Sequence, residues 1–199
     1  MEIIDKILGP AETRTLLLIC PETNETVVVD PSFYSFHHFS PIIRDRGLTL
    51  KMVWLTHSHW DHIADIAKFH DLGAPVFVHP LDQGNVIAPG SDGLRAPKVI
   101  ESVREPKNFQ EGDTLRFGSC HCLVMETPGH SPGSVCFYFP KEEILLSGDT
   151  LFRGAIGRLD LPTSRPELMR GSLNKLNLLP ENTLVYPGHG PTTTIREEL

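Results

Sequence analysis

Short apolar runs separated by turn residues recur along the chain, and their lengths predict β-strands. The runs TLLLIC (15–20) and TVVVD (26–30) flank the polar stretch PETNE, which predicts a β-hairpin. KMVWLT (51–56) and PVFVHP (75–80) predict two more strands, and the first of these is apolar enough to be buried. The first part of the chain therefore indicates a sheet of short strands.

The second part repeats this pattern. CHCLVMET (120–127), SVCFYFP (134–140) and EILLSG (143–148) predict three strands, and TLVYPG (183–188) predicts the last one. We expect one domain over residues 1–199, made of two similar halves at roughly 1–112 and 113–199.

Two segments have helical spacing of their apolar residues. In 61–73 the apolar positions fall on one face and the segment ends at a glycine, so we expect a helix there. In 164–179 we expect a second helix, with Ser164 as its N-cap and Glu167 completing a capping box. Strands and helices that alternate in both halves predict an α/β protein with layered, packed sheets.

Two other segments are harder to assign. The segment 33–47 predicts only a poor helix, because Pro41 lies inside it. This segment contains a cluster of aromatic and histidine residues within 33–39, which favours a packed helix or a dimer contact over a substrate-binding lip. Residues 85–108 are rich in proline and glycine and predict an irregular segment, either a lid or a plain connector. The cluster is formed by Phe33, Tyr34, Phe36, His37, His38 and Phe39.

Composition excludes several classes of partner. The chain has 199 residues, 40 % of them apolar, and a formal net charge of −7, with no run of five Lys or Arg residues. Nucleic acid is therefore not expected as a partner, because phosphate binding depends on clustered positive charge. The apolar run LLLIC (16–20) is too short for a signal peptide or a membrane span, so we expect a cytoplasmic protein without membrane contact. We expect reduced, buried thiols at Cys20, Cys120, Cys122 and Cys136.

Potential metal ligands follow the predicted strands. Four of them occur within THSHWDH, directly after the strand 51–56. Three more follow the strands 120–127, 143–148 and 183–186, each beside a glycine. Because strand ends converge at one edge of a sheet, we expect these side chains to meet there. The seven residues are His57, His59, Asp61, His62, His130, Asp149 and His189.

Five imidazoles and two carboxylates suit borderline divalent metals. A single metal seldom takes seven protein ligands, whereas two metals do when a carboxylate bridges them. Asp149 stands alone after its strand and is the natural bridge. We expect two divalent ions, with zinc first and iron or manganese as alternatives.

The ordered motifs resemble those of the metallo-β-lactamase-fold hydrolases. THSHWDH matches their HxHxDH motif, and the three later ligands match their remaining positions over nearly the whole chain. This resemblance implies an αββα four-layer sandwich. It also implies that His57, His59 and His130 hold one metal. Asp61, His62 and His189 would then hold the other, with Asp149 bridging.

Within the family, the sequence is most similar to the short glyoxalase II-like thioester hydrolases. GDTLFRGAIGRLDLP (148–162) resembles their GDTLF segment, and YPGHGP resembles their last ligand loop. By this resemblance Arg158 contacts the substrate, and the alternative is an internal ion pair with Asp160. Full-length glyoxalase II has an added C-terminal helical domain, whereas this chain stops ten residues after His189, so the thiol carrier stays open. Class B β-lactamases are disfavoured because they use Cys or Ser at position 149, and flavodiiron proteins because they use Glu at position 59.

The resemblance leads to a concrete hypothesis. We expect a metal-bound hydroxide to attack a 2-hydroxyacyl thioester such as S-lactoylglutathione, with Asp61 orienting the nucleophile. The alternatives are a mononuclear-iron persulfide dioxygenase, a lactonase or phosphodiesterase, and a non-catalytic binding protein of the same fold. The expected partner is a small-molecule thioester, and the chain is either a monomer or a homodimer.

Overall fold

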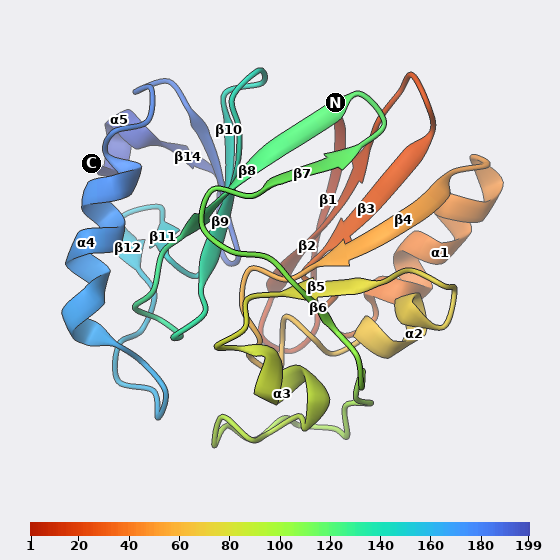
Figure 1. Cartoon of the computed structure of the whole chain (residues 1–199), viewed down its shortest axis with the longest axis horizontal. Coiled ribbons are helices and arrows are strands. Elements are labelled where there is room, and N and C mark those ends of the chain that lie inside the picture. The colour runs from red at the N-terminus through yellow and green to blue at the C-terminus, as the bar shows by residue number, and fades with distance from the viewer.

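Two six-stranded sheets pack face to face, and helices cover their outer faces (Figure 1). The computed structural model describes all residues from 1 to 199. In the first sheet β1 to β3 are antiparallel and β3 to β6 are parallel. Its strands, in spatial order, are β1 (Glu2–Leu8), β2 (Thr13–Ile19), β3 (Glu25–Val29), β4 (Thr49–Trp54), β5 (Val76–Val78) and β6 (Lys107–Asn108).

The second sheet is antiparallel except for one parallel pair, β10 with β13. Its strands, in spatial order, are β14 (Thr193–Thr194), β13 (Leu184–Pro187), β10 (Ile144–Gly148), β9 (Val135–Phe139), β8 (Cys120–Glu126) and β7 (Thr114–Phe117). A small separate hairpin pairs β11 (Leu151–Phe152) with β12 (Ala155–Ile156).

Most of the helices lie on the two outer sides of the sandwich, whereas α3 lies below β5 and β6 in Figure 1. In Figure 1, α1 and α2 lie against the first sheet and α4 lies along the second. None of the helices combines the length and the apolar character needed to cross a bilayer. The helices are α1 (Ser35–Asp45), α2 (Ile66–His70), α3 (Gln83–Ile87), α4 (Pro166–Leu176) and α5 (Ile195–Glu198).

Three apolar cores separate these four layers. In β2, Leu16 and Leu18 belong to the core between the sheets, whereas Leu17 belongs to the core beneath α1 and α2. In the second sheet, Phe137 faces the first sheet and its neighbour Tyr138 packs in the core towards α4. Successive strand residues point to opposite faces, so a strand covered on both sides is apolar at every position. This explains the continuous apolar runs and confirms the αββα sandwich.

The strands predicted from the apolar runs are present within a few residues of their expected bounds. The hairpin between β2 and β3 is confirmed, with Leu16 opposite Val29. All four cysteines are buried free thiols, as expected. The sequence patterns missed β1, whose residues are half-exposed, and β7, which has too few apolar residues to stand out.

The predicted helix over 61–73 was too long at both ends. Helix α2 covers only Ile66–His70, and residues 61–65 and 71–73 form turns and bends. The backbone N–H of Asp65 donates to the carbonyl of Pro31 at 2.9 Å, so it cannot join a helix. This turn places Asp61 and His62 on the same side as the other ligands.

Two other helix predictions also need correction. Ser164 is not the N-cap of α4: its hydroxyl donates to the carbonyl oxygen of His130 at 2.9 Å, and the helix begins after Arg165 without a side-chain cap. The capping box with Glu167 does not form. The poor helix expected over 33–47 is a regular helix, α1, in spite of Pro41. Its buried face, with Phe39 and Ile43, packs on the first sheet and outweighs the missing hydrogen bond.

Candidate metal centre

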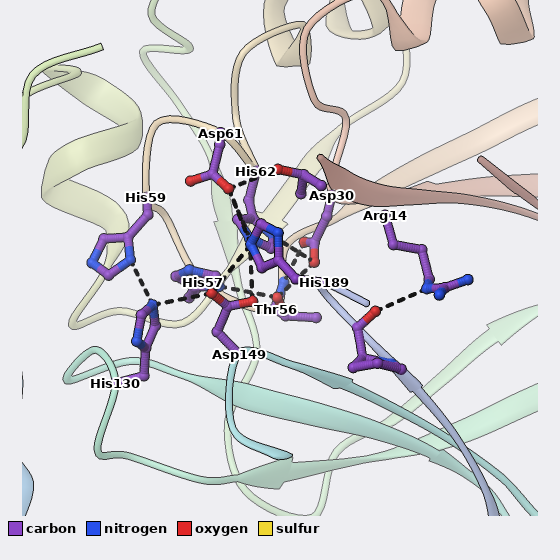
Figure 2. A network of polar contacts seen from close by, with 12 residues as sticks. Arg14, Asp30, Thr56, His57, His59, Asp61, His62, His130, Asp149 and His189 are labelled. Atoms are coloured by element: carbon purple, nitrogen blue, oxygen red, sulfur yellow. Dashed lines mark hydrogen bonds and ion pairs between the residues drawn. The ribbon is translucent and has the colours of Figure 1, made fainter. Parts of the chain in front are cut away.

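The seven predicted ligand side chains meet at one end of the sandwich, and Figure 2 shows them pointing toward a common centre. Two parallel strand pairs end at this place and bring the side chains together. The pair β3 and β4 ends beside Asp30 and His57, while the pair β10 and β13 ends beside Asp149 and His189. Three groups of possible ligand atoms each lie within 4.8 Å of one another. These groups are His57–His59–His130, His57–His62–Asp149 and Asp61–His62–His189.

Four of the five imidazoles are anchored through Nδ1. Nδ1 of His130 lies 2.9 Å from the carbonyl oxygen of Arg158, and Nδ1 of His189 lies 3.1 Å from that of Ala11. A carbonyl oxygen only accepts, so both rings carry a proton on Nδ1, and the neutral form of each ring has its lone pair on Nε2. This tautomer is the one that a metal-binding imidazole needs.

A buried carboxylate, Asp30, orients two more rings. Its Oδ2 lies 3.0 Å from Nδ1 of His62 and accepts a hydrogen bond from Thr56 Oγ1 at 2.6 Å. Because the Thr56 hydroxyl donates its hydrogen to Asp30, its oxygen accepts a hydrogen bond from Nδ1 of His57 at 3.2 Å. The backbone N–H of Thr56 donates to the other oxygen of Asp30 at 2.7 Å. One carboxylate therefore sets the tautomer of both His57 and His62.

The two acidic ligands lie between the rings. Asp149 Oδ2 is 3.3 Å from Nε2 of His130 and 3.4 Å from Nε2 of His189. Asp61 Oδ2 is 3.3 Å from Nε2 of His189 and accepts a hydrogen bond from Thr13 at 2.7 Å. Ligand atoms bound about 2.1 Å from one tetrahedral ion lie about 3.4 Å apart. The spacing of these side chains therefore fits shared cations, and Asp149 contacts rings of both groups.

The donor atoms also lack other partners. Nε2 of His57 and of His62, and Oδ1 of Asp149, are buried without a hydrogen bond within the protein. Buried polar atoms are nearly always paired, and a group of unpaired imidazole nitrogen and carboxylate oxygen atoms fits a divalent cation. The residues present fit a divalent metal centre.

The charges inside the cluster are strongly coupled. Burial alone would raise the pKa of Asp61, but the charge of His62 and the hydrogen bond from His189 bring it to about 2. Burial would lower the pKa of His189, but the hydrogen bonds to Asp149 and Asp61 raise it to about 9. Burial, reinforced by the charge of His130, lowers the pKa of His59 to about 3. The metal-free cluster thus holds protons on some rings and excludes them from others.

The remaining predicted site residue, Arg158, lies at the margin of the centre. Arg158 lines the cavity above the cluster, and its guanidinium also binds Asp160 at 2.9 and 3.0 Å, which was the alternative to a substrate contact. Two other histidines have hydrogen-bond partners outside the cluster. Nδ1 of His70 lies 3.0 Å from the carbonyl oxygen of Ala74, and Nε2 of His79 lies 2.9 Å from Oε1 of Glu126.

Sequence reasoning missed Asp30 and Thr13. Both lie at strand ends and hold ligands through their side chains. The only signal for Asp30 was an acidic residue directly after the buried run VVV, a pattern that also occurs in ordinary turns.

Comparison with known proteins agrees with this geometry. A model of the metallo-beta-lactamase superfamily matches residues 12–189. The chain is 35 % identical over 195 residues to the "Probable metallo-hydrolase YqgX" of Bacillus subtilis, an alignment that covers 96 % of this chain and 91 % of the relative. It is 36 % identical over 152 residues to the hydroxyacylglutathione hydrolase of Bartonella quintana, covering 76 % of this chain and 53 % of the relative.

Solved structures of the same fold include three informative ones. The BLEG-1 B3 metallo-beta-lactamase superposes with a TM-score of 0.89 at 34 % identity, covering 98 % of this chain and 95 % of the other. TTHA1623, solved in a di-iron-bound form, has a TM-score of 0.80 at 36 % identity, covering 97 % and 95 %. ETHE1 from Myxococcus xanthus has a TM-score of 0.81 at 27 % identity, covering 99 % and 81 %.

Proposed function

The chain belongs to the metallo-beta-lactamase superfamily, and from that premise we propose that it hydrolyses a 2-hydroxyacyl thioester such as S-lactoylglutathione. The observation that carries the proposal is the meeting of seven possible ligand side chains, in which Nε2 of His57, Nε2 of His62 and Oδ1 of Asp149 are buried without a hydrogen bond. His57, His59 and His130 would hold one cation, and Asp61, His62 and His189 the other, with Asp149 between them. When bound, such divalent ions act as Lewis acids and lower the pKa of water to about 7.

Asp61 is the residue that we assign to orienting the nucleophile. Its Oδ2 is occupied by Thr13, whereas no protein donor lies on its Oδ1. With a pKa of about 2 it is ionised at neutral pH and can only accept hydrogen bonds. A water molecule that donates one O–H to this oxygen keeps a lone pair directed at the substrate carbonyl.

The cavity above the cluster has room for such a substrate. Its volume is about 450 Å³, and its walls combine the ligands with the apolar side chains of Trp60, Leu94, Phe152 and Leu161. Trp60 and Leu94 also line a neighbouring cavity of about 620 Å³, which carries the cations of Arg95 and Lys98. The acyl group and a larger, anionic thiol can therefore occupy adjoining spaces. We assign Arg158, at the margin of the first cavity, to a carboxylate or amide of the substrate.

Support for a thioester over other substrates comes from sequence similarity. The segment 148–162 resembles the glyoxalase II pattern, and a relative of 36 % identity is named hydroxyacylglutathione hydrolase. A leaving thiolate is stable at neutral pH, so the chain does not need a strong general acid near the leaving group. We propose zinc as the resident metal, with iron as the main competitor because a similar structure holds two irons.

A second candidate, the persulfide dioxygenase reaction, is kept because ETHE1 shares the fold over 99 % of this chain. One substrate panel separates the candidates. Protein loaded with zinc or iron is assayed with S-lactoylglutathione, with a thioester of N-acetylcysteamine, with a lactone, with a phosphodiester and with a β-lactam. Oxygen uptake with glutathione persulfide is measured in parallel. Thioester cleavage well above the other rates is the expected result. Oxygen uptake without thioester cleavage, or faster turnover of the lactone, phosphodiester or β-lactam, would replace the proposal.

A further inference from the structure

Asp82 is a buried carboxylate that lies between two ligand-bearing loops. Only 4 % of its surface is exposed, and no Lys, Arg or His pairs with it. Its Oδ2 accepts from the backbone N–H of Ser58 at 2.9 Å and from the hydroxyl of Ser131 at 2.8 Å. Its Oδ1 accepts from the backbone N–H of Gly133 at 2.7 Å. A charge buried in this way is expensive unless these three bonds are kept.

The bonded groups belong to loops from different sheets. Ser58 directly precedes His59 in the loop after β4, and Ser131 directly follows His130 in the loop after β8. The two loops bring His59 Nδ1 to within 2.8 Å of His130 Nε2. Because Asp82 accepts from both loops, its carboxylate fixes the distance between the two imidazoles. A Cβ added at Gly133 would lie only 2.7 Å from Asp82 Oδ1, so the backbone at position 133 can approach the carboxylate this closely only because the residue is glycine.

His59 depends on this support more than the other rings do. Its Nε2 is buried and has no hydrogen-bond partner, and its Nδ1 lies 2.8 Å from Nε2 of His130, whereas Nδ1 of each of the other four rings is anchored by a residue outside the ligand set. Apart from the contact with His130, the position of His59 is therefore set by its backbone. That backbone is held on both sides of Ser58: the N–H by Asp82, and the carbonyl by the side-chain amide of Asn85. Asn85 is itself fixed by Asp92 at 2.9 Å.

We propose that Asp82 is a positioning residue for the His57–His59–His130 site and sets the affinity of that site for a divalent cation. It has no contact with the anchors of the second site, which are Thr13 for Asp61, Asp30 for His62 and Ala11 for His189. The proposal rests on the proposed function only in requiring that the centre binds metal.

The two sites are separated by testing Asp82→Asn in two backgrounds. The His189→Ala background leaves the three-histidine site complete, and the His130→Ala background leaves the Asp61–His62 side with its other ligands. The affinity of metal-free protein for Zn²⁺ is measured by competition with a chromophoric chelator, and thermal unfolding of the metal-free protein is recorded in parallel. In the His189→Ala background we expect Asp82→Asn to weaken Zn²⁺ binding about 10- to 100-fold, because outer partners of ligands act on this scale. In the His130→Ala background the change should stay within about threefold.

A milder variant guards against misfolding. Ser131→Ala removes one of the three bonds and should weaken Zn²⁺ binding about three- to tenfold in the His189→Ala background. Asp113→Asn is the matched control, since Asp113 accepts from the backbone N–H of Gln110 in a turn away from the centre. Equal losses in both backgrounds, or a lower melting temperature with unchanged Zn²⁺ affinity, would overturn the proposal. Thioester hydrolysis plays no part in this readout, so a wrong substrate assignment leaves the test of Asp82 intact.

Discussion

Oδ2 of Asp30 lies 3.0 Å from Nδ1 of His62, and both side chains are buried. The same oxygen reaches His57 through the hydroxyl of Thr56. Each of the two proposed metal sites therefore has one ring whose tautomer is set by Asp30. This link joins the sites through the protein, in addition to the link that Asp149 provides.

Replacing Asp30 with asparagine should weaken metal binding at both sites. The amide keeps one acceptor but turns donors toward His62 and Thr56, so at least one buried donor loses its partner. We expect Zn²⁺ affinity to fall about 10- to 100-fold and unfolding stability to fall by about 1–3 kcal/mol. Chelator competition and thermal unfolding measure the two effects. Wild-type affinity in Asp30→Asn would show that the tautomers are set by other groups.

Binding of metal at pH 7 should release protons. In the metal-free protein, hydrogen bonds to Asp149 and Asp61 hold the pKa of His189 at about 9, and the charges of Asp61, Asp149 and Asp30 overcome burial to raise the pKa of His62 well above its usual value. Both rings are then protonated at pH 7 and must lose their proton to bind metal. Calorimetric titration in buffers of different ionisation enthalpy should report up to two protons released, falling as pH rises through about 9. A heat that is the same in every buffer would contradict this.

The same shift predicts how pH affects the metal-free fold. The folded pKa of His189 is raised above its unfolded value, so its contribution to stability is complete below the unfolded pKa of about 6.5 and is lost as pH rises toward 9. Denaturant unfolding of metal-free protein at pH 6.5 and pH 9 measures this loss. The variant His189→Ala should lose less stability than the wild type over that interval. An equal loss in both proteins would assign the effect to other groups.

Asp149 and His189 should differ in what their removal does to metal content. Asp149 contacts rings of both groups, so Asp149→Ala should reduce the bound metal from about two equivalents to less than one. His189 belongs to only one group, so His189→Ala should retain about one equivalent. Elemental analysis after dialysis against metal measures both. Equal stoichiometry in the two variants would remove Asp149 from the bridging position.

Arg158→Ala should raise KM for the thioester about three- to tenfold with unchanged metal content. Its ion pair with Asp160 is exposed to solvent and is expected to be weak, so Arg158 can exchange this partner for a substrate group. Arg116→Ala, on the exposed face of β7, is the matched control. Steady-state kinetics on the best thioester and elemental analysis provide the two readouts. Unchanged kinetics would leave Arg158 with Asp160 as its only role.

Gly148→Ala, a change directly before the predicted ligand Asp149, should lower both the stability and the metal affinity of the protein. Gly148 has a φ of +50°, and an added Cβ would lie 2.5 Å from Thr56 Oγ1. The strain and the displaced Thr56 should cost about 2–4 kcal/mol of stability and lower the metal affinity. Gly171→Ala in α4 is the control, because an added Cβ there meets nothing within 4 Å. A Gly148→Ala protein with wild-type stability and metal content would show that the two sheets have room to separate at this end.

Much of the fold could be predicted from the sequence, because strands covered on both faces must be apolar at every position. The runs at 15–20 and 134–140 are visible for this reason alone. Strands such as β1 and β7 were missed because one of their faces meets solvent and their pattern resembles that of a loop. The start of α2 was misplaced because a tertiary hydrogen bond, from Asp65 to Pro31, overrides the helical periodicity of 61–73.

The sequence by itself pointed to the seven side chains that the structure brings together, because five histidines and two aspartates each follow an apolar strand. Only the tertiary structure decided which atom of each ring faces the centre, since this depends on hydrogen bonds from residues far away in the chain. Asp30 contacts His62, 32 positions away, and Asp82 accepts from the backbone N–H of Gly133, 51 positions away. No local pattern records such contacts. They exist because the two sheets pack face to face and bring their strand ends together.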